Sequence, residues 1–195
     1  MERVKAMKKI LVIFDCFGVL GERVGSVFMA RHLDSEVKKK IEETLVIDGD
    51  VGKITREEFF GGLADAAGMT VDEVIAEYDS LYKLHPELIP VIEKSRSFAD
   101  TALLSNAFFG HAEGIIDRFN IRRLFDKVFL SCDMKLAKPD PEIYEVARDA
   151  FGKDYDEVYM VDDTDENLTP LSDIGIIPIK YVSPDSVTEA LAKYF

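Results

Sequence analysis

Five short apolar runs, separated by longer segments with helical periodicity, constrain the fold of this chain more than any other feature. The runs cover residues 10–14, 101–104, 127–130, 158–161 and 178–182. The first is apolar throughout, as expected for a parallel strand that is covered on both faces. Strands that alternate with helices indicate a doubly wound α/β fold. We therefore expect a Rossmann-like parallel five-stranded sheet with helices on both faces.

Helical periodicity is clearest in the second half of the chain and at its end. Ile143, Val146 and Ala147 recur at the three-to-four spacing of an amphipathic helix. Ser186 and Glu189 have the spacing of a capping box, so we expect the last helix to begin there.

The segment between the first two runs has a different character. It contains no strand-like run, and its capping boxes, Thr55 with Glu58 and Thr70 with Glu73, indicate successive helices. About 70 residues are too many for one crossover helix. We therefore expect a helical cap over residues 20–89, inserted above the carboxyl ends of the strands of a core that comprises residues 1–19 and 90–195.

Composition excludes several classes of partner. The chain has 24 Lys and Arg residues against 37 Asp and Glu, a net charge of −13. A surface this acidic repels phosphate backbones, which argues against nucleic acid and against an anionic membrane as partners. No segment approaches the roughly 20 apolar residues of a membrane span. Two cysteines without metal-ligand spacing fit a cytosolic protein in a reducing compartment.

Polar residues directly follow the first four apolar runs. In an open parallel sheet, ligands bind outside the carboxyl ends of the strands, so these residues are the candidate site. Clustered carboxylates need a hard cation such as Mg²⁺, and lysine and hydroxyl donors suit phosphate oxygens. The set predicts a phosphoryl-transfer site. Its members are Asp15, Ser105, Asn106, Lys138, Asp162 and Asp163.

These four stretches resemble, in order, the four motifs of the haloacid dehalogenase-like hydrolase superfamily, and the resemblance covers essentially the whole chain. The first reads Asp-Cys-Phe-Gly-Val from Asp15, and the third is Lys-Pro-Asp from Lys138. The helical insert resembles the small cap of that superfamily. Residues 52–59, and Ser105-Asn106 with His111 after them, are most similar to a branch of small sugar-phosphate-type phosphatases.

The resemblance implies roles for four of these residues. Asp15 would be the nucleophile that forms an aspartyl-phosphate, which water then hydrolyses. Ser105 and the backbone N–H of Asn106 would hold phosphoryl oxygens, and Lys138 would bridge the phosphoryl group and Asp15. His111, early in a helix, is as well explained by a solvated helix start as by contact with substrate.

The resemblance also implies a Mg²⁺ site. Its ligands would be Asp15, the backbone carbonyl of Phe17, and Asp163. Asp162 would either lie behind the metal or pair with Lys138, and the sequence leaves open which of the two aspartates touches the ion.

One departure from the family pattern concerns the acid–base group. Phosphatases of the superfamily usually carry a second Asp two residues after the nucleophile, and here that position is Phe17. General acid–base catalysis is worth typically about 10²- to 10⁴-fold, so another acid, such as His111 or a cap residue, would have to help. The missing Asp does not by itself exclude a phosphatase, because some members of the branch have Gly there.

Three functions are therefore open. The first is a Mg²⁺-dependent phosphatase acting on a small phosphorylated metabolite, which the acidic fourth motif and Lys138 favour. The second is a metal-independent 2-haloacid dehalogenase, which the aromatic Phe17 favours and the Asp162-Asp163 pair opposes. The third is a catalytically weakened protein that binds a phosphate or a partner.

Overall fold

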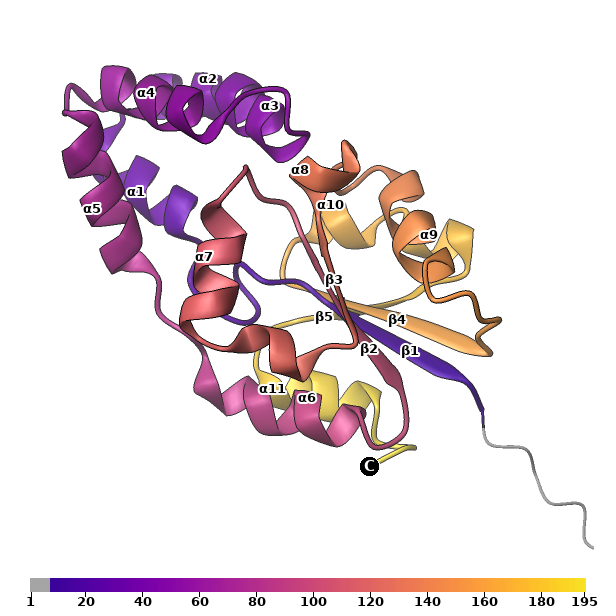
Figure 1. The fold of residues 1–195 in the computed structure, drawn as a ribbon. Coiled ribbons are helices and arrows are strands. Elements are labelled where there is room, and N and C mark those ends of the chain that lie inside the picture. Colours follow the sequence, from indigo (N-terminus) through magenta and orange to yellow (C-terminus); the bar gives the residue numbers. More distant parts are fainter. Residues whose placement is uncertain (1–7) are drawn as a thin grey trace, which may run out of the picture.

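The structure, a computed structural model, describes residues 8–195, so the first seven residues of the expected core segment lie outside it. A parallel sheet of five strands runs through the middle of the molecule (Figure 1), in the order β3-β2-β1-β4-β5. The expected α/β fold is confirmed. The strands are β1 (Ile10–Phe14), β2 (Asp100–Ser105), β3 (Lys127–Leu130), β4 (Glu157–Asp162) and β5 (Ile177–Lys180).

The central strand is β1, flanked by the strands that end at Ser105 and Asp162. The fifth strand differs from the expected range of 178–182, because β5 begins at Ile177 and ends at Lys180. Lys180 pairs with Asp162, the last residue of β4. Beyond it the Tyr181 N–H still donates to the Asp162 carbonyl at the end of β4, and Val182 is 77% exposed.

Helices cover both faces of the sheet. They are α6 (Ile89–Ser95), α7 (His111–Arg118), α8 (Ser131–Met134), α9 (Pro141–Asp149), α10 (Asp165–Leu168) and α11 (Pro184–Ala190). Alternate side chains of β1 enter two separate apolar clusters, as the twofold period of a strand requires. Val12 and Phe14 pack with residues of α6, α7 and α11, whereas Leu11 and Ile13 pack with α9.

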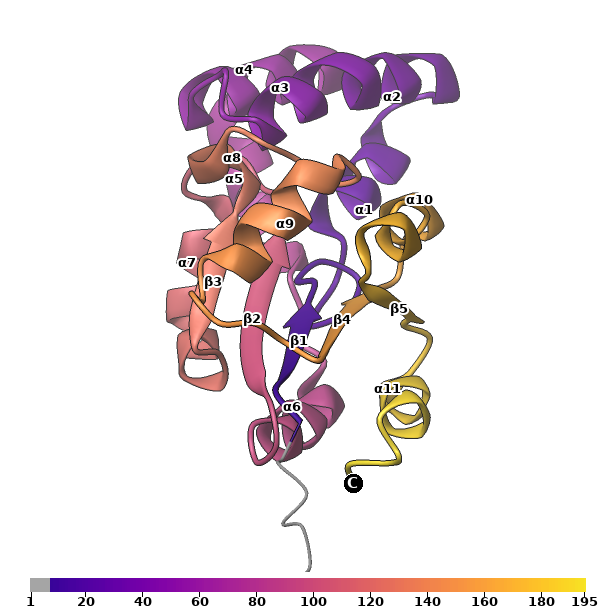
Figure 2. The same ribbon diagram turned by 90° about the vertical axis from the view of Figure 1, so that its right-hand side faces the viewer.

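The segment between β1 and α6 is helical, and we call residues 20–89 the cap. Its α4 and α5 begin at the expected Thr55–Glu58 and Thr70–Glu73 capping boxes. Figures 1 and 2 both show the cap helices beyond the carboxyl ends of the strands. The cap helices are α1 (Val24–His32), α2 (Ser35–Ile41), a π-helical segment (Glu42–Val46), α3 (Ile47–Asp50), α4 (Arg56–Ala67) and α5 (Val71–Leu81).

The last helix begins earlier than the sequence predicts. The expected capping box of Ser186 with Glu189 is wrong, because Ser183 is the N-cap and pairs with Ser186 instead. Pro184 occupies the first helical position, where its missing N–H costs no hydrogen bond. The helix therefore begins at Pro184, and three residues separate it from Lys180, the last residue of β5.

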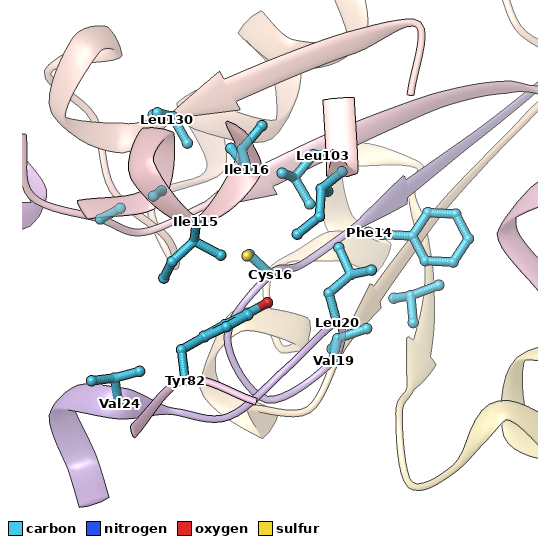
Figure 3. Packing of buried hydrophobic residues seen from close by; sticks show 14 of the residues in the cluster. Phe14, Cys16, Val19, Leu20, Val24, Tyr82, Leu103, Ile115, Ile116 and Leu130 are labelled. Atoms are coloured by element: carbon cyan, nitrogen blue, oxygen red, sulfur yellow. The ribbon is translucent and has the colours of Figure 1, made fainter. Parts of the chain in front are cut away.

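The residue after Asp15 belongs to the core. Figure 3 shows Cys16 among Tyr82, Leu103 and Ile116, and its side chain is fully buried. Burial raises the pKa of the Cys16 thiol to about 12, so the thiol is not a nucleophile at neutral pH. Within residues 8–195, no helix is both long and apolar enough to cross a membrane.

Candidate active site

The carboxyl ends of β1, β2 and β4 meet beneath the cap, and a cavity of about 310 Å³ opens there. Core residues on its wall include Asp15, Asn106 and Lys138, while the cap contributes Arg23 and Asp50. Of the residues singled out in the sequence, those that line this cavity are Asp15, Phe17, Asn106, His111 and Lys138, whereas Ser105, Asp162 and Asp163 lie outside its wall.

A buried lysine links two of the carboxylates. Lys138 Nζ lies 2.7 Å from Asp15 Oδ1 and 2.6 Å from Asp162 Oδ2. Asp15 and Lys138 are each 5% exposed, and Asp162 is fully buried. Two carboxylates and one ammonium leave a net negative charge in a desolvated site, which an additional cation would neutralise.

The environment shifts the pKa values of this group. Burial raises the pKa of Asp15 to about 7, although the neighbouring Lys138 ammonium acts to lower this pKa. Burial acts to lower the pKa of Lys138, but the Asp15 and Asp162 carboxylates outweigh it and raise that pKa. Lys138 is therefore held as an ammonium facing Asp15.

Asn106 fixes the position of Lys138. Its side-chain amide donates to the Lys138 carbonyl and its side-chain carbonyl accepts from the Lys138 N–H, both at 2.9 Å. Ser105, at the end of β2, is fully buried, and its hydroxyl donates to the Asn106 carbonyl at 3.3 Å. Ser105 is not among the residues that form the cavity wall, so the structure brings it beside the site rather than onto its surface.

The two neighbouring aspartates differ in how their oxygens are used. Both oxygens of Asp162 accept hydrogen bonds, from Lys138, Asn167 and the Thr164 N–H. By contrast, Asp163 Oδ1 is buried and accepts no hydrogen bond from the described residues. Asp15, Asp162 and Asp163 each place an oxygen within 4.8 Å of the others. The described partner of Asp163 Oδ1 is therefore a cation, the Arg23 guanidinium, whereas the Asp162 oxygens are held by Lys138 and Asn167.

Arg23 approaches this group from the cap. Its guanidinium lies 2.6 Å from Asp163 Oδ1 and also contacts the Thr164 hydroxyl. The carboxylates of Asp163 and then Asp15 and Asp162 raise the pKa of Arg23, although burial acts to lower it. In this geometry the Arg23 cation compensates part of the negative charge of the cluster.

Phe17 and His111 form one aromatic wall of the cavity. Their rings stack with centroids 4.9 Å apart, and Phe108 also stacks on His111, at 4.8 Å. Burial lowers the pKa of His111 to about 3, helped by the charge of Arg56. His111 begins α7 and lines the cavity, so it is not a solvated helix start.

Sequence patterns missed three charged residues of the cavity wall, Arg23, Glu42 and Asp50. None of them follows a strand, so the rule that located the other candidates could not find them. Asp50 does carry a local signal, because Gly49 and Gly52 flank it and glycines near a polar residue can mark a close approach of backbone.

A family model described as haloacid dehalogenase-like hydrolase matches residues 11–175. Among solved structures, the HAD family enzyme bt-2542 from Bacteroides thetaiotaomicron is 26% identical with a TM-score of 0.72, covering 90% of this chain and 94% of that one. The same enzyme is known in complex with magnesium and inorganic phosphate, again at 26% identity and a TM-score of 0.72, with 89% and 93% of the two chains covered.

A more distant solved structure shares the fold alone. It is an L-2-haloacid dehalogenase from Xanthobacter autotrophicus with chloropropionic acid covalently bound, 17% identical with a TM-score of 0.67. The match covers 96% of this chain and 83% of that one.

The curated relatives are much longer proteins. Acyl-CoA dehydrogenase family member 10 from Mus musculus is 28% identical over 201 residues, which cover 92% of this chain and 18% of that protein. Bifunctional epoxide hydrolase 2 from Sus scrofa is 34% identical over 73 residues, 37% of this chain and 13% of that protein. This chain thus spans less than a fifth of their length.

The fold, the order of the four polar stretches around one cavity and the match over residues 11–175 agree. This chain belongs to the haloacid dehalogenase-like hydrolases.

Proposed function

We propose that this hydrolase is a Mg²⁺-dependent phosphomonoesterase acting on a small phosphorylated metabolite. The observation that carries the proposal is the buried contact of Lys138 with both Asp15 and Asp162. An ammonium held beside a carboxylate nucleophile attracts a phosphoryl group and positions it for attack. The bound magnesium and phosphate of the related Bacteroides enzyme are consistent with this chemistry.

In the proposed reaction, an oxygen of Asp15 attacks phosphorus and displaces the alcohol, leaving an aspartyl-phosphate that water hydrolyses. Lys138 contacts the phosphoryl group and keeps the nucleophile oriented. The Asn106 N–H donates to a phosphoryl oxygen. For the Ser105 hydroxyl to donate as well, it would have to turn from the Asn106 carbonyl toward the cavity. Asn106 acts a second time, because its side chain holds the Lys138 backbone in place.

The residues present fit a divalent cation. Asp163 Oδ1, which accepts no hydrogen bond within residues 8–195 but pairs with the Arg23 guanidinium at 2.6 Å, lies in a cluster with Asp15 and Asp162, and oxygen ligands of this kind suit Mg²⁺. We assign Asp15, Asp163 and the Phe17 carbonyl as ligands, and we place Asp162 behind them as the partner of Lys138. When bound, Mg²⁺ would neutralise negative charge on the transferred phosphoryl group.

The size of the cavity limits the substrate. A volume of about 310 Å³ lies at the lower end of ligand pockets. Its wall combines aromatic rings with the charged groups of Arg23 and Asp50. These features support a small phosphate ester whose alcohol portion is enclosed by the cap.

The test is a screen of phosphorylated metabolites with Mg²⁺ and with excess chelator, run on the parent and on Asp15→Asn. We expect phosphate release that needs Mg²⁺ and disappears in Asp15→Asn, because the nearly isosteric amide does not attack phosphorus. Release that persists in a correctly folded Asp15→Asn would contradict the proposal.

Dehalogenation of a small 2-haloacid is the second candidate, because the Phe17 ring lines the cavity beside the nucleophile. The same protein incubated with 2-haloacids and chelator distinguishes the two functions. Halide release without metal would favour the dehalogenase. If neither phosphate nor halide is released while phosphate binds, the chain is a phosphate-binding member that has lost catalysis.

A further inference from the structure

We propose that Asp50, a residue of the cap, is the general acid and base that the active site lacks at Phe17. The proposal rests on the phosphatase function proposed above and names the group that would protonate the leaving alcohol. It depends on where the cap places this carboxylate and on the groups around it.

Asp50 is the last residue of α3 and lines the cavity that Asp15 and Lys138 also line. Its side chain is partly accessible, as expected for a group that faces the cavity. Among residues 8–195, no hydrogen bond or ion pair engages its carboxyl, although Asp48 in the same helix pairs with Lys53 at 3.1 Å. Asp50 is therefore free to exchange a proton with a ligand.

Two glycines beside Asp50 let the cap approach the core closely. A Cβ atom at Gly49 would lie 2.9 Å from the Phe59 ring and 3.1 Å from Phe108 Cβ. Gly52 has φ +63°, a Cβ there would collide with the Cys132 carbonyl, and its own carbonyl accepts from Lys135 Nζ at 2.9 Å. These contacts fix the Asp50 backbone over the core.

Burial, rather than the nearby charges, favours a protonated Asp50. Burial raises the pKa of Asp50 to about 7, the Lys138 ammonium opposes this shift, and the Asp15 carboxylate adds to it. Tyr78 lines the same cavity as Asp50. The other charged or titratable groups on the cavity wall are Arg23, Glu42 and His111.

His111, the other cavity residue that could act as an acid, does not suit the role. Its ring stacks with both Phe17 and Phe108, and burial lowers its pKa to about 3. It is therefore neutral at pH 7 and has no acidic proton to give. Glu42, the other cap carboxylate on the wall, is 44% exposed and lies 3.7 Å from Lys38 Nζ, so Asp50 is the carboxyl that remains for this role.

The proposed proton transfers balance. When Asp15 attacks phosphorus, the bond from phosphorus to the ester oxygen breaks, and that oxygen takes the proton of the Asp50 carboxylic acid. The resulting Asp50 carboxylate then takes a proton from the water that attacks the aspartyl-phosphate. Inorganic phosphate leaves, and both carboxyl groups return to their starting states.

The experiment compares Asp50→Asn with the parent on alkyl phosphates and on 4-nitrophenyl phosphate, whose leaving group needs little protonation. The value of kcat/KM reports the first transfer to Asp15. We expect it to fall about 10²-fold or more for alkyl phosphates and to stay close to the parent value for the nitrophenyl ester. We also expect a burst of nitrophenol followed by slow turnover, because the base for the second step is missing.

The pH profile provides a second readout. With the parent, kcat/KM for alkyl phosphates should fall as pH rises through about 7, because only protonated Asp50 donates. In Asp50→Asn this alkaline limb should disappear. Asp48→Asn is the matched control, since it removes a carboxylate of the same helix that does not line the cavity.

An equal loss of kcat/KM for both classes of ester in Asp50→Asn would overturn the proposal and indicate a substrate-binding role. Unchanged kinetics would also overturn it. Neither result affects the proposed function, which the parent's own Mg²⁺-dependent turnover tests. A parent that hydrolyses no phosphate ester would overturn the proposed function, and this inference with it.

Discussion

The backbone of Gly18 packs directly against the carboxylate of Asp163. A Cβ atom at Gly18 would collide with both carboxylate oxygens of Asp163, and Gly18 has φ +97°. The loop after β1 and the end of β4 are thus in contact where the candidate metal ligands lie. Glycine is needed at this position for its backbone conformation and for space.

We predict that Gly18→Ala disrupts the site. The added methyl group must displace the Asp163 carboxylate, and the positive φ adds strain of about 1 to 3 kcal/mol. Activity should be lost together with Mg²⁺ affinity. Gly152→Ala is the control, because Gly152 has φ +63° but no atom within 4 Å of the added carbon. Thermal unfolding should show destabilisation in both variants, with activity retained only in Gly152→Ala.

The second prediction separates the two aspartates after β4. Loss of a residue that only holds a metal ligand in place typically weakens metal binding about 10- to 100-fold. Asp163→Ala should weaken Mg²⁺ binding by more than this, because it removes a direct ligand. Asp162→Asn should stay within that range, because Asp162 contacts Lys138 and Asn167 instead. Calorimetric titration with Mg²⁺ measures both. If Asp163→Ala binds Mg²⁺ as tightly as the parent, the assignment is wrong.

The fold could be predicted from the sequence because each strand signal is local. The run at 10–14 is apolar throughout, and the structure buries every residue of it. The apolar pattern predicts a fifth strand over residues 178–182, whereas β5 spans Ile177–Lys180, because the length of a strand depends on its partner. The partner strand β4 ends at Asp162, which pairs with Lys180, and the local sequence of β5 carries no information about where β4 ends.

The candidate site was predictable as far as it lies on the sheet. Asp15, Asn106 and Lys138 line one cavity because parallel strands bring their carboxyl ends to one edge. Asp50 could not be found in this way. Its place at the cavity depends on the docking of α3 against α8, which involves Gly52 and Lys135 far apart in the sequence.

The third prediction concerns pH and His111. Burial lowers the pKa of His111 to about 3, whereas an unfolded chain binds the proton near pH 6.5. Below pH 6.5 the unfolded state therefore binds more protons, so stability is complete above pH 6.5 and decreases as pH falls toward 3. Between pH 6.5 and pH 5 the protonation of His111 should lower the free energy of unfolding by up to about 2 kcal/mol.

The variant that measures this effect is His111→Phe, which keeps an aromatic ring against Phe17 and Phe108. Chemical denaturation of the parent and of the variant at pH 7.5 and pH 5 gives, for each protein, the loss of unfolding free energy between the two pH values. Carboxylates titrate in both proteins, so the contrast between them isolates His111. An equal loss of stability in both would show that His111 is readily protonated in the folded protein.

The last prediction uses Phe17, the position where related phosphatases carry their acid. If Asp50 supplies the proton, Phe17→Asp in the parent should change the ratio of alkyl- to aryl-phosphate turnover little. In an Asp50→Asn background the same change should raise alkyl-phosphate turnover, up to about 10²-fold if the new carboxylate is well placed. Phe17→Asn in that background is the matched control, because its amide has no acidic proton to give.

Stability must be measured first, because Phe17 packs on His111 and Tyr82. Phe17 is only partly buried, so its replacement should cost less than the about 3 to 5 kcal/mol of a fully buried Phe. Folded protein is therefore expected, and thermal unfolding checks it before the kinetics are interpreted. A 10²-fold gain for Phe17→Asp in the parent would mean that its active site has no working acid, and Asp50 would then be excluded from that role.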